Sequence, residues 1–116
     1  MRLMMKIAIP NEPCNSMMKA GTFGPTMGRI LAAIKPEAAY FTTIDGQRGG
    51  FIVVDVDDAH KVPSIAEPLF QAFKASIETG VAMTAEDLQT ADDDIAQAAK
   101  STARPNTIPK YLAIQE

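Results

Sequence analysis

Cysteine and histidine are almost absent from this chain of 116 residues, which has one of each. A single cysteine, Cys14, excludes a framework of disulfide bonds within the chain. The lone histidine, His60, leaves no His/Cys cluster with the spacing of a zinc site. We therefore expect no metal and no other cofactor. Cys14 is interpreted as a packed thiol and His60 as a solvated or capping residue of a turn.

Long apolar runs and an excess of positive charge are also missing. No run approaches the ~20 apolar residues of a membrane span, and 11 Lys and Arg stand against 14 Asp and Glu, for a net charge of -3. Nucleic acids and anionic membranes normally call for a basic patch, so we expect neither as a partner. The first ten residues, MRLMMKIAIP, carry no small-residue cleavage site. They predict a first strand rather than a signal peptide, and hence a cytoplasmic protein.

The clearest positive signal is a β-hairpin in the stretch EAAYFTTIDGQRGGFIVVDV, residues 37–56. Asp45 and Gly46 supply the two positive φ angles of a two-residue turn. With this turn, Ile44 pairs with Gln47, Tyr40 with Phe51 and Ala38 with Val53. The second strand, FIVVDV, is apolar on both faces, so both faces need cover. Helices of the chain can cover one face, and a second copy of the chain is the economical cover for the other because burying each large apolar side chain contributes roughly 1.5–3 kcal/mol.

The order of expected elements is β-α-β-β-α-β followed by a C-terminal helix. This order predicts an α+β, ferredoxin-like antiparallel sheet with helices on one face. We expect a single domain over residues 1–100 and an extended tail over residues 101–116. Hydrophobic periodicity and capping residues place the elements as follows: strand 2–9, an interrupted helix over 11–20 and 26–35, the hairpin, helix 63–73 kinked at Pro68, strand 75–83, and a helix from a Thr84 cap to about Lys100.

Strand alternation assigns the side chains to the two faces of this sheet. The face expected to meet the helices carries Leu3, Met5, Ile7, Ile9, Phe41, Ile52, Val54, Ile77 and Val81. The opposite face carries Met4, Lys6, Tyr40, Thr42, Phe51, Val53, Asp55, Ser76 and Glu78.

Several runs carry a resemblance to a known family: KPEAAYF, DG, GFIVVDVDD, IAEPLF and VAMTAEDL. Together they resemble a family of small uncharacterised bacterial proteins in the dimeric α+β barrel superfamily, and the resemblance covers roughly residues 1–99. It implies a homodimer in which two ferredoxin-like sheets pack face to face. The superfamily includes cofactor-free monooxygenases, haem enzymes and isomerases, so the fold does not select a function. The resemblance carries no defined catalytic motif.

The candidate site lies on the predicted inward face of such a barrel. Lys6, Tyr40, Asp55 and Glu78 combine amine, phenol and carboxylates in a partly dry space, where they can act as acid and base or orient a ligand beside Phe51. Lys6 and Glu78 can equally be an interface pair that satisfies its own charges. Three functions therefore stay open: a homodimer that binds a small, mostly apolar molecule between its sheets; a cofactor-independent monooxygenase or isomerase using Tyr40 and Glu78; and a purely structural dimer.

Overall fold

The computed structural model describes residues 1–102 of the chain. The chain divides into two compact units, Met1–Ala82 and Met83–Glu116, which are described separately. The predicted tail, residues 101–116, lies outside the described residues from position 103 onward.

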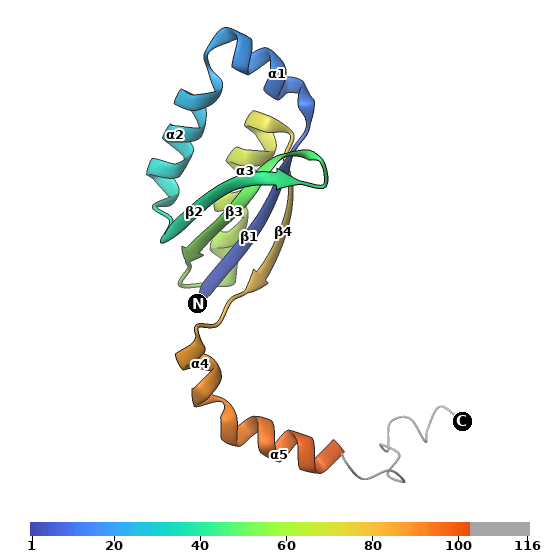
Figure 1. The fold of residues 1–116 in the computed structure, drawn as a ribbon. Coiled ribbons are helices and arrows are strands. Elements are labelled where there is room, and N and C mark those ends of the chain that lie inside the picture. Colours follow the sequence, from blue (N-terminus) through green and yellow to red (C-terminus); the bar gives the residue numbers. More distant parts are fainter. Residues whose placement is uncertain (103–116) are drawn as a thin grey trace, which may run out of the picture. The chain divides into compact units, whose positions relative to one another are not determined.

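The first unit is an α+β arrangement built on one four-stranded antiparallel sheet with the strand order β2-β3-β1-β4 (Figure 1). This topology is consistent with a ferredoxin-like fold. The predicted interruption of the first helix is present as two helices, α1 and α2. The bounds along the chain are β1 (Arg2–Ile9), α1 (Asn11–Ala20), α2 (Phe23–Ile34), β2 (Ala38–Ile44), β3 (Gln47–Asp55), a 3-10 turn (Ala59–Lys61), α3 (Val62–Phe73) and β4 (Ser76–Val81).

The hairpin β2–β3 forms with the predicted turn and register. Asp45 and Gly46 both have positive φ, 52° and 76°, as a type I′ turn requires. Tyr40 faces Phe51 across the two strands, and the pairs on either side of it follow the same register. The Asp-Gly pair therefore fixes which side chains share a face of the sheet.

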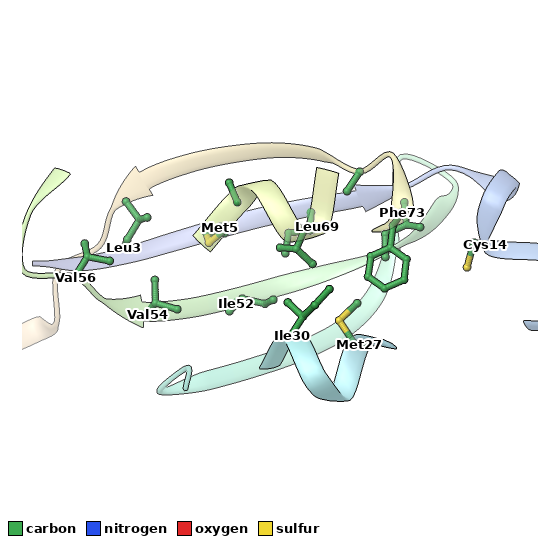
Figure 2. Close-up of a cluster of buried hydrophobic side chains, with 14 residues drawn as sticks. Leu3, Met5, Cys14, Met27, Ile30, Ile52, Val54, Val56, Leu69 and Phe73 are labelled. Carbon is green, nitrogen blue, oxygen red and sulfur yellow. The ribbon is translucent and has the colours of Figure 1, made fainter. Parts of the chain in front are cut away.

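The hydrophobic core lies between the sheet and helices α1, α2 and α3 (Figure 2). Phe73 and Leu69 of α3 are fully buried, and the Phe73 ring lies 5.0 Å from that of Phe23, at an angle of 46°. Cys14 is 0% exposed, which confirms the prediction of a packed thiol. The sheet contributes the predicted alternating set from its two central strands: Leu3, Met5, Ile7, Ile9, Ile52 and Val54.

Two residues predicted to pack against the helices are exposed instead. Phe41 and Val81 keep 57% and 64% of their surface accessible, so the prediction of burial was wrong for both. They belong to the edge strands β2 and β4, whereas the fully buried strand residues come from the central strands β1 and β3. Strand alternation gives the face of a residue, but it does not say how far the covering helices extend toward the edges.

The second unit contains two helices in its described part, α4 (Ala85–Thr90) and α5 (Asp92–Thr102). The predicted cap is present: the Asp87 N–H donates to the Thr84 hydroxyl oxygen at 3.1 Å, and the Thr84 N–H donates to the Asp87 carboxylate at 3.0 Å. The expectation of one continuous helix to Lys100 was wrong, because Ala91 separates the two helices with ψ near -2°.

Candidate functional site

The candidate site is the sheet face that points away from the helical layer. On this face the strand register places Tyr40, Phe51, Lys6 and Glu78 in one row that runs across β2, β3, β1 and β4. Four of the five side chains proposed from the sequence are thus neighbours in a single line, which we call the central row.

The rows on either side of the central row contain mainly small side chains. One of them consists of Ala38, Val53, Met4 and Gly80, and the other of Thr42, Gly49, Ala8 and Ser76. Apart from Met4, the side chains of these two rows are smaller than those of the central row.

The central row is aromatic on one side and charged on the other. Tyr40 on β2 is 69% exposed, and Phe51 on β3 is half-buried. Lys6 on β1 and Glu78 on β4 carry the charges. Met4, in the neighbouring row, is a further exposed apolar side chain at 42%. Water covers much of this apolar surface in the single chain, so any partner that displaces it gains hydrophobic free energy.

Lys6 and Glu78 are direct cross-strand neighbours, yet no ion pair joins them in the part of the chain that the structure describes. Opposite charges in such positions stabilise a sheet by only ~0.2–1 kcal/mol, so little holds them together in water. Both charges are available to a group approaching from outside the sheet. Pairing of Lys6 with Glu78 across an interface between two copies stays an open alternative.

The tip of the hairpin bends over one end of this face. Ile44 belongs to the same side of β2 as Tyr40, but it is only 7% exposed. With Asp45 it closes a small pocket of about 60 Å³ whose other walls are Lys6, Ala8, Ser76 and Glu78. Ligand pockets for whole organic molecules usually measure roughly 300–1,000 Å³, so this pocket by itself holds no more than a small fragment of a ligand.

The fifth predicted residue, Asp55, lies apart from the central row. It follows Phe51 by four positions on β3, which corresponds to about 13 Å along a strand. Its carboxylate accepts a hydrogen bond from the amino group of Met1 at 3.1 Å, and its cross-strand neighbour is Arg2. Asp55 therefore contributes to the end of the sheet and not to the group around Phe51.

Tyr40 and Glu78, the two weak catalytic candidates, lie on opposite edge strands. Three strand spacings separate them, or about 14 Å measured across the sheet. Direct proton transfer needs heavy atoms ~2.6–3.2 Å apart or one bridging water. One chain therefore does not offer Tyr40 and Glu78 as a joint acid–base pair, although two copies facing each other could bring one of each together.

The histidine and the possible metal ligands can be examined over the described residues. His60 is exposed in the turn before α3, as predicted. Within residues 1–102, no group of three or more His, Cys, Asp or Glu side chains is placed to hold a metal ion. No helix in that range is both long enough and apolar enough to cross a membrane.

Sequence reasoning missed the part of the site that the bent hairpin creates. The available signal was the glycine pair in QRGGF: a Cβ atom on Gly49 would collide with the backbone oxygen of Ile7 and come within 2.7 Å of the Ile44 side chain. Adjacent glycines inside a strand often mark a bend or a close backbone approach. Here they accompany the folding of the Ile44 side chain onto β1.

No protein-family model matches the chain, and no curated protein matches it. The proposed function therefore rests on the geometry of the sheet face.

Proposed function

We propose that this chain acts as a homodimer that binds a small, mostly apolar molecule between two facing sheets. The observation that carries the proposal is the central row on the sheet face opposite α1, α2 and α3. In it, two aromatic side chains lie beside two opposite charges that form no ion pair among the described residues. The proposed dimer corresponds to the dimeric α+β barrel that the sequence resembles.

A second copy is the partner that best matches the charge pattern of this face. A twofold axis pairs one surface with itself, so each contact occurs twice. Lys6 of one copy then approaches Glu78 of the second copy, and the reverse contact forms at the same time. A face with one cation and one anion in a row is complementary to itself under this symmetry.

The same packing leaves room for a ligand. Gly80 has no side chain beside the central row, so two sheets that touch through Tyr40 and Phe51 stay apart there. The 60 Å³ pocket beside Lys6, walled by Ile44 and Asp45 of the hairpin tip, adds to the space on this face. The second copy supplies the missing wall, and the lining is apolar on the β2–β3 side with polar groups on the β1–β4 side, as is common for small-molecule sites.

Catalysis is a weaker proposal than binding because of the separation between Tyr40 and Glu78. A cofactor-independent monooxygenase or isomerase would have to take the phenol from one copy and the carboxylate from the other. Binding requires no such alignment, and neither does a purely structural dimer that fills its own interior.

The mass in solution tests the dimer. Light scattering at micromolar concentration is expected to give twice the 12.5 kDa mass of the chain. Val53→Lys, on the uncovered face, places a charge in the proposed interface and is expected to yield monomer. Phe70→Lys is the matched control, because Phe70 is an exposed apolar residue of α3 on the helical side. A wild-type chain that runs as a monomer contradicts the proposal.

Native mass spectrometry of the purified dimer tests the ligand. An additional mass on the wild-type dimer that is lost in Phe51→Ala supports a molecule between the sheets. A dimer without any additional mass, which also fails to take up a library of small apolar compounds, would leave the structural dimer as the better description.

A further inference from the structure

We propose that a second site, on the helical side of the sheet, binds a small amphipathic carboxylate with its chain in an apolar cavity and its carboxylate on Arg48. The cavity measures about 350 Å³. It lies beside the turn end of the hairpin, next to the end of α1 and the start of α2. It lies on the other side of the sheet from the central row and does not depend on dimerisation.

The cavity has an apolar floor and apolar walls. Ile9, at 2% exposure, and Phe23, which packs on Phe73, form the floor. Met18 near the end of α1 and Phe41 of β2 line the walls and are 45% and 57% exposed. Met18 and Phe41 thus line the same hollow with about half of their surface accessible to water. An apolar chain that enters the hollow removes this surface from water.

The sheet register places Phe41 and Arg48 on the helical side of the sheet. Phe41 faces Gly50 on β3, and Gly50 faces Ile7 on β1. Arg48 comes next along β3 on the same side, between Thr43 and Ile9.

Arg48 supplies the charge that defines the ligand class. Its Nη1 donates to the Asn15 Oδ1 of α1 at 2.8 Å, which holds the guanidinium across the gap between helix and hairpin. Asn15 is neutral, and no carboxylate in the part of the chain that the structure describes pairs with Arg48. A guanidinium has five N–H donors arranged to suit a carboxylate. An anchored, unneutralised arginine at the rim of an apolar cavity matches an apolar chain that ends in a carboxylate.

A second apolar hollow, of about 280 Å³ between α2 and α3, also has an arginine at its edge. Arg29 there donates at 3.4 Å to Thr26 of its own helix, and no hydrogen bond within the described residues anchors it across the hollow. Its lining is aliphatic, with Ile30, Ile34 and Ile65 already packed in or against the core. Arg29 is therefore the matched control for Arg48.

Octanoate and 1-octanol are the probes, because they share a chain and differ in charge. In a titration followed by ¹H–¹⁵N NMR, octanoate is expected to shift the amides of residues 41–43, 48–49, 18 and 23. Arg48→Gln is expected to weaken octanoate binding at least about tenfold, since a hydrogen bond to a charged group contributes more than a neutral one. The affinity for 1-octanol is expected to stay unchanged. Phe41→Ser is expected to weaken the binding of both probes. Phe41→Leu keeps an apolar wall and is expected to weaken their binding less.

Circular dichroism and thermal melting establish that each variant is folded. Retained octanoate affinity in Arg29→Gln supports the assignment to Arg48. Equal affinity for octanoate and 1-octanol overturns the role of Arg48. Shifts confined to the α2–α3 hollow or to the central row, or no shifts at millimolar octanoate, overturn the site itself, whereas loss of the dimer alone would bear only on the proposed function.

Discussion

Gly50 of β3 lies against the backbone of Tyr40 in β2, so closely that a Cβ atom added to Gly50 would collide with the Tyr40 carbonyl oxygen. A backbone group cannot rotate away as a side chain can, so the two strands must separate to admit even a methyl group. The hairpin contributes Tyr40 and Phe51 to the central row and Phe41 and Arg48 to the proposed carboxylate site, so this contact supports part of both.

Gly50→Ala is expected to lower the free energy of unfolding by about 1–3 kcal/mol, the usual cost of forcing an additional methyl group into a packed site. Urea unfolding followed by circular dichroism measures it. Gly80→Ala is the control, because Gly80 is also in a strand but has no atom within 4 Å of its added Cβ. There the change is expected to be stabilising by up to about 1 kcal/mol, through loss of unfolded-state entropy. Equal effects at both positions would contradict the close approach.

Phe73 anchors the helical layer, and Phe70 of the same helix provides a comparison. Phe73 is 0% exposed against 40% for Phe70. Phe73→Ala is expected to cost about 3–5 kcal/mol, since it removes a buried ring that packs on Phe23 and leaves a cavity. Phe70→Ala is expected to cost less than Phe73→Ala, because 40% of the Phe70 surface is already accessible to water. Chemical denaturation measures the free energy of unfolding of both variants. Similar losses would contradict the placement of Phe73 in the core and Phe70 at the surface.

The sequence predicted those parts of the fold that depend on local rules. Asp45-Gly46 determines the turn and register because few residue pairs adopt two positive φ angles. The Thr84 cap follows from a side chain three residues from its partner. Strand alternation predicts one face for all five candidate residues, and the register brings four of them into the central row.

The remaining features depend on where the helices and the hairpin tip lie over the sheet, which periodicity does not encode. Phe41 and Val81 were assigned to the correct strands but to the wrong environment, because coverage of edge strands is a tertiary property. Ile44 is only 7% exposed because its own hairpin bends, and strand alternation does not predict such a bend. Arg48 was not considered as a site residue, because only the packing of α1 beside β3 brings Asn15 to it.

Lys74, after the last residue of α3, is in the left-handed region with φ 53°, a conformation that costs a non-glycine residue roughly 1–2 kcal/mol. Lys74→Gly is therefore expected to raise the free energy of unfolding by about 0.5–1 kcal/mol, after the entropic cost of a new glycine is deducted. Gly21 ends α1 in the same conformation, with φ 73° and open space around it. Gly21→Ala is expected to change stability in the opposite direction. Thermal melts that moved both variants in the same direction would refute this account.

The last prediction concerns the start of α4. Thr84→Ala removes the hydroxyl that accepts the Asp87 N–H, and loss of such a cap typically costs about 0.5–2 kcal/mol of helix stability. Hydrogen exchange at the Asp87 and Leu88 amides is expected to accelerate several-fold to roughly thirtyfold, since each 1.4 kcal/mol corresponds to a factor of ten.

Thr90 provides the matched control for this cap. Its hydroxyl donates to the Glu86 carbonyl oxygen within the same helix, so Thr90→Ala deletes a threonine hydrogen bond without exposing an N–H group at the helix start. Exchange at Asp87 is expected to be nearly unchanged in Thr90→Ala and largely restored in Thr84→Asp, whose carboxylate can again accept the N–H. Similar exchange at Asp87 in Thr84→Ala and Thr90→Ala would show that general loss of helix stability, rather than capping, controls this terminus.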